Sequence, residues 1–157
     1  MERDKLDKTY MNMATELSKL SHAQRRKVGC LIVKDTHIIA EGINGTPRGF
    51  DNKCEYVDHV DHYYTKPEVL HAESNAITKL ARSTNSSKDA TLYVTCCPCF
   101  DCSKLIIQAG ITRVVYKEAY SKNGLDLLRK AKIDVECINN GTPTDDFPEG
   151  HYKGDFA

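Results

Sequence analysis

The part of the chain after residue 90 alternates strand-like and helix-like segments, and this alternation restricts the fold more than any other feature. ATLYVTC (90–96), TRVVYK (112–117) and IDVECI (133–138) are rich in β-branched and aromatic residues and predict strands. The segment from Pro98 to Ala109, stopped by Gly110, and the segment LDLLRKA (125–131) predict the intervening helices. Because strand–helix–strand crossovers are right-handed, these three strands should run parallel.

The first half of the chain predicts a helix, a hairpin and a second helix. Apolar side chains recur at steps of three and four over residues 4–20. KVGCLIVK (27–34) and THIIAEGIN (36–44) predict paired strands, and HAESNAITKLAR (71–82) predicts a helix. Residues 44–68 show no period, which predicts a long functional loop.

These elements together predict one α/β domain over residues 1–157. Its architecture should be a three-layer α/β/α sandwich around a mixed five-stranded sheet, with helices on both faces. From about residue 139 the Gly, Pro and Asp content predicts an irregular C-terminal tail.

Charge and hydropathy narrow the range of partners. Twenty-two basic residues balance 22 acidic residues, which argues against a nucleic-acid or membrane-surface partner. No apolar run approaches the ~20 residues that span a bilayer, and the charged, amphipathic N-terminus does not resemble a secretory signal. We therefore expect a cytoplasmic protein, in the host cytoplasm if its source is viral.

Four of the seven cysteines lie within TLYVTCCPCFDCSKL (91–105), and their spacing favours metal binding or a reactive thiol over a disulfide framework. If Pro98 takes the first helical position, Cys99 and Cys102 lie one turn apart on the same face. The helix dipole favours thiolate there. A Cys96/Cys99 pair would instead straddle the corner between strand and helix. Free cysteine behaves as a small hydrophobe, and this is the role expected for Cys30, Cys96, Cys97 and Cys137.

His71 is the third candidate ligand, because it stands at the predicted start of another helix. Both helices can begin at the same edge of the sheet, so His71, Cys99 and Cys102 can converge. Two thiolates and one imidazole leave the fourth tetrahedral position for water, which is the pattern of a catalytic zinc. Glu73 is placed to move protons rather than to bind metal. A redox pair or a structural zinc is the alternative, and the joint pattern H-A-E … P-C-x-x-C favours the catalytic site.

With these motifs the chain resembles the cytidine deaminase superfamily of zinc-dependent deaminases and, within it, the deoxycytidylate (dCMP) deaminases. The resemblance covers roughly residues 8–138, through RRKVGCLIVKD, GINGTPRG, HAESNAI, TLYVTCCPCFDCSKLIIQAGI and VVYKEAY. Cys30 stands where family members often have alanine. The resemblance implies hydrolytic deamination of dCMP to dUMP and ammonia, which supplies the precursor of thymidylate. It also implies one Zn²⁺ on His71, Cys99 and Cys102, with Glu73 as proton shuttle.

Substrate contacts follow partly from charge and partly from the resemblance. Arg25 and Arg26 precede a strand that would carry them to the rim of the site, and arginine is the usual bidentate phosphate partner. The alternative is a solvated charge run. The resemblance implies that Asn44 contacts the sugar and that Tyr120 packs over the pyrimidine; a rim or core aromatic is the alternative for Tyr120.

The resemblance further implies a homohexamer activated by dCTP and inhibited by dTTP, with Mg²⁺ as the ion that would accompany the triphosphates. Gly45 and Gly49 allow close backbone approach to such an effector, while Arg48 and Lys53 supply charge. Arg82 resembles a gating position in some members. The alternative is that the loop only covers the active site.

Several rival interpretations are weaker. Cys54, His59 and His62 could belong to a second zinc site, but no fourth ligand is evident, since SHAQRR has no cysteine. A tRNA adenosine deaminase should be basic, which the zero net charge does not favour. A catalytically dead nucleotide-sensing subunit would not need Glu73. A dCTP-accepting or bifunctional deaminase would need only one or two more cations.

Overall fold

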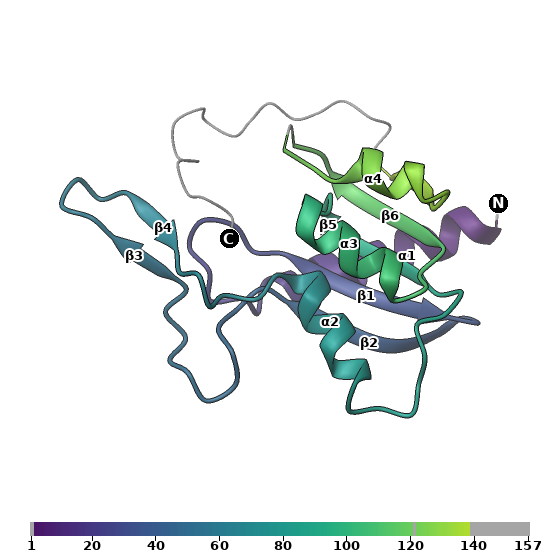
Figure 1. Ribbon diagram of the computed structural model, residues 1–157, viewed down its shortest axis with the longest axis horizontal. Helices are drawn as coiled ribbons and strands as arrows, with labels where there is room; N and C mark the ends of the chain where they lie inside the picture. Colours follow the sequence, from purple (N-terminus) through teal and green to yellow (C-terminus); the bar gives the residue numbers. More distant parts are fainter. Residues whose placement is uncertain (1, 121, 139–157) are drawn as a thin grey trace.

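The computed structural model describes residues 2–120 and 122–138, which build a five-stranded sheet between layers of helices (Figure 1). The strands are β1 (Gly29–Lys34), β2 (His37–Ile43), β5 (Thr91–Cys96), β6 (Arg113–Glu118) and β7 (Asp134–Cys137). Their order across the sheet is β2-β1-β5-β6-β7. β1 is antiparallel to β2 and β5, whereas β5, β6 and β7 run parallel. The predicted hairpin, the parallel strands and the mixed sheet are confirmed.

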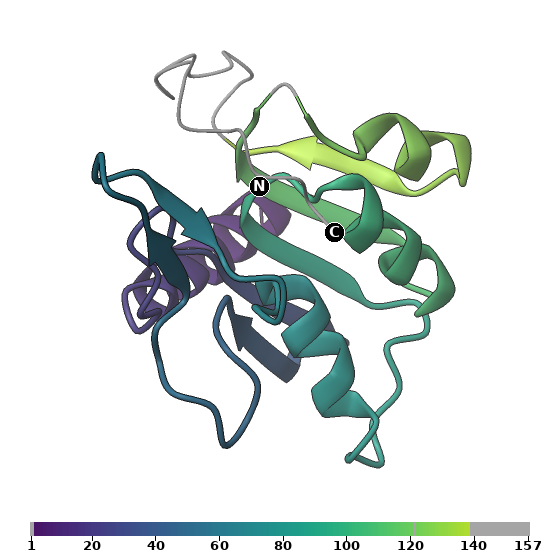
Figure 2. The ribbon, with the colours of Figure 1, turned by 60° about the vertical axis from the view of Figure 1, so that its left-hand side comes forward.

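Helices cover both faces of this sheet, as Figures 1 and 2 show. They are α1 (Glu2–Ser18), α2 (Ala72–Leu80), α3 (Phe100–Gln108) and α4 (Leu125–Lys130). On the α1 face, Met11 belongs to a buried cluster with Leu31 and Tyr93 of the sheet. On the other face, Ile106 of α3 and Leu128 of α4 belong to the larger cluster that buries the opposite side of the strands. The three-layer sandwich is confirmed.

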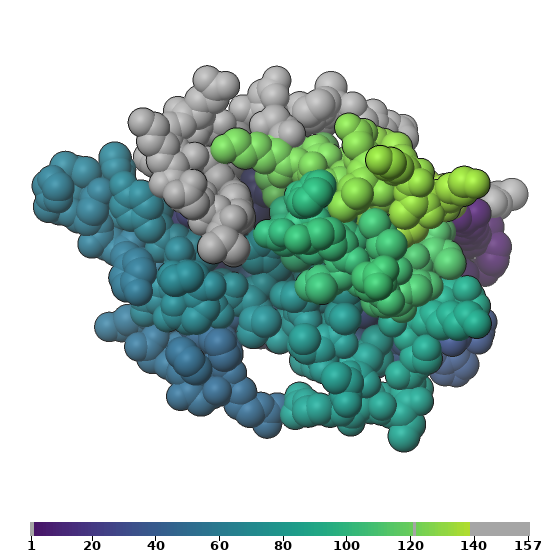
Figure 3. Space-filling view, in the orientation of Figure 1, coloured from purple at the N-terminus to yellow at the C-terminus, as the bar shows by residue number. Residues whose placement is uncertain are grey.

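The predicted long loop over residues 44–68 is wrong in one respect, because it contains a second hairpin. β3 (Glu55–Val57) pairs with β4 (Tyr63–Thr65), and the hairpin projects away from the main sheet (Figures 1 and 3). Oδ1 of Asp58 fixes the turn by accepting the backbone N–H groups of Val60 and His62, both at 2.9 Å. Strands of three residues are too short to produce a recognisable alternation in the sequence.

The predicted start of α3 is also corrected. Pro98 lies outside the helix, and its carbonyl accepts the N–H of Gly124 at 2.8 Å. Cys99 is the N-cap, with extended backbone (φ −71°, ψ 173°), and its thiol accepts the N–H of Cys102. The helix starts later than predicted because the thiol of Cys99 caps it in the place that serine or aspartate often takes. The other predicted helices are confirmed.

Two expectations concern the ends of the chain and the membrane. The irregular tail predicted from residue 139 lies outside the described residues, so the single domain over residues 1–157 stays a prediction. In the part of the chain that the structure describes, no helix combines the length and the apolar character needed to cross a membrane.

Candidate metal centre and active site

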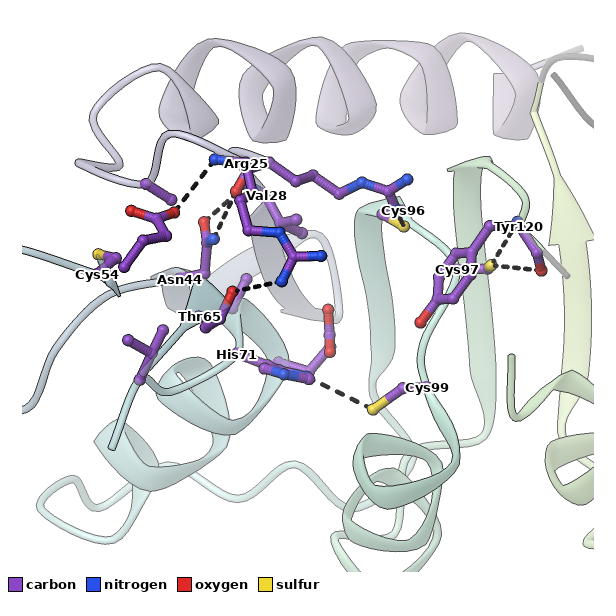
Figure 4. Close-up of a pocket in the computed structure, with 16 residues that line it drawn as sticks. Arg25, Val28, Asn44, Cys54, Thr65, His71, Cys96, Cys97, Cys99 and Tyr120 are labelled. Atoms are coloured by element: carbon purple, nitrogen blue, oxygen red, sulfur yellow. Dashed lines mark hydrogen bonds between the residues drawn. The ribbon is translucent and has the colours of Figure 1, made fainter. Parts of the chain in front are cut away.

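The residues predicted for the metal and the substrate lie at one edge of the sheet, and the directions of the strands explain why. β5 and β6 run parallel and end together, with Cys96 paired to Glu118. β1 is antiparallel to β5, so the residues that precede β1 lie at this same edge. β2 is antiparallel to β1, and its end returns there as well. The arginine segment, Asn44, the N-termini of α2 and α3, and Tyr120 therefore meet around one cavity (Figure 4).

The three predicted metal ligands converge. His71 is the N-cap of α2, Cys99 is the N-cap of α3, and Cys102 lies in the first turn of α3. Nδ1 of His71 lies 3.5 Å from Sγ of Cys99 and 3.3 Å from Sγ of Cys102, and the three atoms all lie within 4.8 Å of one another. A nitrogen at about 2.0 Å and a sulfur at about 2.3 Å from a tetrahedral zinc lie about 3.5 Å apart. The donor set and its spacing therefore fit a zinc ion.

Two glycines allow the ligand-bearing helices to approach so closely. A Cβ on Gly42 of β2 would lie 2.2 Å from the carbonyl oxygen of Ala72, the first residue of α2. A Cβ on Gly124 would lie 2.2 Å from Oγ of Ser103 and 2.7 Å from the carbonyl oxygen of Cys99. Larger residues at either position would push a helix N-terminus, and its ligand, away from the other.

Local electrostatics favour the thiolate form of Cys99, whereas its hydrogen bonds raise the pKa of the neighbouring Cys102 thiol and of the His71 imidazole. Hydrogen bonding with Cys102, and then with His71, lowers the pKa of the Cys99 thiol to about 4, although burial opposes this shift. The backbone N–H of Cys102 also donates to Sγ of Cys99 at 3.5 Å. Both cysteines are buried at the positive end of α3, where anionic sulfur is stabilised.

Glu73 is the acidic group of this centre. It lies in the first turn of α2 and is only 4% exposed. Burial raises the pKa of its carboxyl group, against a hydrogen bond with Cys102 and the charge of His71. A carboxyl group with a raised pKa can both accept and return a proton near neutral pH. Its placement beside the ligands, and outside the metal-binding group, agrees with the predicted proton-shuttle role.

The arginine segment is held in place by side chains from distant elements. Oδ1 of Asn44 accepts the N–H of Val28 at 2.8 Å, and Nδ2 of Asn44 donates to the carbonyl oxygen of Arg26 at 2.7 Å. Oε1 of Glu55 accepts the N–H groups of Gln24 and Arg25 at 2.8 and 3.1 Å. Asn44 thus has a positioning role in addition to lining the cavity where a sugar contact was predicted.

Both arginine side chains reach the cavity and are held from opposite sides. Nη1 of Arg25 donates to Oγ1 of Thr65 at 3.2 Å. Nη1 of Arg26 donates to Sγ of Cys96 at 2.6 Å, and its guanidinium carbon lies 5.1 Å from the centroid of the Tyr120 ring. Both arginines are half-buried and make side-chain contacts, which argues against the solvated charge run considered as an alternative.

Four lining residues that contact Arg25, Arg26 or Tyr120 were not predicted at the site: Glu55, Thr65, Cys96 and Cys97. The two thiols are buried as predicted, but they also contact site residues, since Sγ of Cys97 accepts the N–H of Tyr120 at 3.3 Å. Cys30 is fully buried and Cys137 is half-buried, in agreement with packing roles. For Cys96 and Cys97, the only sequence signal for a place at the site was that they lie within three residues of Cys99.

A second metal site is not supported among the described residues. His71, Cys99 and Cys102 form the only group there that could hold an ion. Cys54 is buried and donates to the carbonyl oxygen of Asn52 at 3.7 Å, whereas Nδ1 of the exposed His62 lies 3.6 Å from a carboxylate oxygen of Asp58.

The residues predicted for an effector site do not line the active-site cavity. Gly45 borders a second cavity and has open space where a side chain would stand. Gly49 has a φ of +88°, which favours glycine, and its surroundings are equally open. The cationic members of this set are exposed, and none of them lines the active-site cavity: Arg48, Lys53 and Arg82.

Comparison with known proteins supports this interpretation of the site. Residues 4–118 match the cytidine and deoxycytidylate deaminase zinc-binding region. The deoxycytidylate deaminase of Saccharomyces cerevisiae is 36% identical over 140 residues, which are 85% of this chain and 45% of the yeast protein. That of Enterobacteria phage T4 is 34% identical over 167 residues, covering 81% of this chain and 86% of the phage protein. The chain thus spans under half the length of its yeast relative but most of the length of the phage one.

A solved structure of a dCMP deaminase is similar to this chain in both sequence and fold. The dCMP deaminase of cyanophage S-TIM5, crystallised in complex with dCMP and dUMP, is 41% identical with a TM-score of 0.79. The match covers 85% of this chain and 96% of the cyanophage chain. The three-layer α/β/α sandwich and the His–Cys–Cys group are the features of a zinc-binding deaminase. The chain belongs to the cytidine and deoxycytidylate deaminase family.

Proposed function

We propose that this chain catalyses the zinc-dependent hydrolysis of dCMP to dUMP and ammonia, and so supplies dUMP for thymidylate synthesis. The observation that carries the proposal is the combination in one cavity of a buried acid, Glu73, a His–Cys–Cys ligand set and two arginines. The similarity to the cyanophage enzyme that binds dCMP and dUMP supports the choice of substrate.

His71, Cys99 and Cys102 would hold the zinc ion. When bound, zinc supplies Lewis acidity that makes water a nucleophile near neutral pH. Glu73 takes one proton from the attacking water and passes it to the ring nitrogen. It then takes the proton of the newly added hydroxyl group and passes it to the amine, which leaves as ammonia when the C–N bond breaks and the C=O bond forms. Burial of the carboxyl group suits this cycle, because its raised pKa makes the proton easier to retain between transfers.

Substrate recognition is proposed to divide between two ends of the cavity. Arg25 and Arg26 bind the phosphate, for which guanidinium groups provide paired donors. Tyr120 packs over the pyrimidine, supported by its position at the cavity and its stacking contact with Arg26. Asn44 contacts the sugar while its amide holds the backbone of the arginine segment.

We further propose that dCTP and dTTP, accompanied by Mg²⁺, regulate the enzyme by binding at residues 44–54. Arg82 would act as a gating residue, and the chain would assemble as a homohexamer. A cavity of about 300 Å³ borders this segment, and Asn44 and Cys54 line both this cavity and the active-site cavity. A ligand that favours one arrangement of the segment could therefore alter the active site through Asn44. A cytoplasmic location is supported by the seven free cysteines.

The test is ammonia release by the zinc-loaded chain from dCMP, deoxycytidine, dCTP and an adenosine-containing tRNA. We expect dCMP to be the best substrate and the tRNA to be inert. Comparable turnover of dCTP would support the bifunctional alternative, and release from the tRNA alone would contradict the proposal.

The regulatory part is tested separately by initial rates against dCMP with and without dCTP or dTTP, together with the particle mass in solution. Activation by dCTP and inhibition by dTTP are expected from a hexamer. Hyperbolic curves that neither triphosphate changes, from a monomer, would refute the regulation without affecting the deaminase assignment.

A further inference from the structure

Glu55 and Thr65 form a directly opposed pair on the β3–β4 hairpin, and both contact Arg25. They are partners in the register of the hairpin, so their side chains lie on the same face of the two-stranded ladder. Glu55 accepts the backbone N–H of Arg25. Thr65 accepts a hydrogen bond from the guanidinium group of Arg25 (Figure 4). The hairpin therefore holds both the backbone and the charged end of this arginine.

The charges at this end of the cavity match a single phosphate group. Among the described residues that line the cavity, Arg25 and Arg26 are the only lysines or arginines. Glu55 adds a carboxylate close to Arg25, whereas the other acidic residue of the lining, Glu73, neighbours the metal ligands. A monophosphate dianion would meet two cations here. A triphosphate would bring two further anionic groups close to the carboxylate of Glu55, and the described lining of the cavity has no further lysine or arginine to receive them.

We propose that Glu55 is a specificity-determining residue that makes this site favour a nucleoside monophosphate over a nucleoside triphosphate. The inference rests on the proposed function, because it takes the arginines as the phosphate-binding groups. The carboxylate has two separable effects. Its oxygen fixes the backbone that carries Arg25, and its negative charge opposes the additional phosphate groups of a longer ligand, as repulsive elements do in other selective sites.

Three variants separate these effects. Glu55→Gln keeps an acceptor oxygen for the two backbone N–H groups and removes the charge, whereas Glu55→Ala removes both. Asp61→Asn is the matched control, since the exposed Asp61 follows β3 in the turn of the same hairpin and does not line the cavity. Asparagine also tolerates the left-handed backbone at this position, where φ is 59°.

The measurements are kcat/KM for dCMP and dCTP, and the Kd values of dUMP and dUTP by calorimetry, all with the zinc-loaded chain. Glu55→Gln should raise the dCTP-to-dCMP ratio of kcat/KM about tenfold, and should tighten dUTP relative to dUMP by about the same factor. Glu55→Ala should weaken dUMP as well, because the segment that carries Arg25 loses its anchor. Asp61→Asn should keep both wild-type ratios.

The proposal is overturned if Glu55→Gln and Asp61→Asn give the same ratios as the wild-type chain. It is also overturned if Glu55→Gln weakens dUMP as much as Glu55→Ala does, because the role would then be structural only. Absence of ammonia release from dCMP would contradict the proposed function, whereas the dUTP-to-dUMP binding ratio would still decide the role of Glu55.

Discussion

Replacing Arg26 by alanine should discriminate between a substrate with a phosphate and one without. The guanidinium group of Arg26 is held 2.6 Å from Sγ of Cys96 and 5.1 Å from the centroid of the Tyr120 ring. A side chain fixed at both positions loses little conformational freedom when a phosphate binds, so most of the interaction contributes to affinity. Deoxycytidine lacks the phosphate and should be affected only through the lost contact with Tyr120.

The expected size follows from the type of contact. A charge-assisted hydrogen bond contributes about 1.5–3 kcal/mol, which corresponds to about 10–150-fold in kcat/KM. The cation–π contact with Tyr120 is lost for both substrates, so the ratio of their kcat/KM values isolates the contribution of the phosphate. Because Arg25 remains, the change for dCMP should not approach complete loss.

The assay is ammonia release from dCMP and deoxycytidine at matched zinc content. Lys27→Ala is the control, because it also removes one positive charge next to Arg26, while Lys27 is exposed and does not line the cavity. Arg26→Lys should give an intermediate effect, because the charge remains while the paired donors are lost. An equal loss for both substrates, or the same discrimination from Lys27→Ala, would refute the assignment of Arg26 to the phosphate.

Three further predictions test the metal, the acid and the fold. Cys102→Ala should lose zinc and activity, whereas Cys97→Ala should keep stoichiometric zinc in a metal analysis; the reverse pattern would contradict the ligand assignment. Glu73→Gln should keep zinc and lower kcat about 10²–10⁴-fold, and a variant with a tenth of wild-type turnover would point to another base. Asp7→Asn should lower the free energy of unfolding in urea by about 2–4 kcal/mol, because the buried Arg113 loses its bidentate partner. Burial alone would raise the pKa of Asp7, but hydrogen bonds from Arg113 and Tyr93 outweigh burial and lower this pKa. The stability that the Asp7–Arg113 pair contributes is therefore present above about pH 4 and is lost as the pH falls further. An Asp7→Asn chain with the same acid dependence as wild type would contradict that account.

Much of the fold and the metal centre could be predicted because their signals are local. The parallel strands β5, β6 and β7 are short β-branched runs separated by helices, and chirality leaves few ways to connect them. His71 and the pair Cys99 and Cys102 each stand at a helix start, and helices that follow parallel strands begin at the same edge of the sheet. The position of these residues along the chain was therefore enough to predict that the three side chains, and Glu73 beside them, lie close together.

The capping of α3 needed the structure, although it concerns the same motif. Pro98 is compatible with the first position of a helix, and equally with a position before the N-cap. The choice depended on the thiol of Cys99, which accepts the N–H of Cys102 in the folded arrangement. The two-residue difference between Pro98 and Phe100 leaves no periodic signal in the sequence.

The side chains that surround Arg25 and Arg26 could be identified only from the tertiary structure. Arg25 meets Glu55 and Thr65 across separations of 30 and 40 residues, and Arg26 meets Cys96 across 70. Each contact is one hydrogen bond between positions that no helical or strand period connects. Hydrophobic periodicity records which face of an element is buried, but it carries no information about which distant polar group a side chain will meet. The sequence by itself therefore determined the main sheet, its helices and the candidate metal-binding group, whereas the packing of β3–β4 against the arginine segment determined what surrounds Arg25.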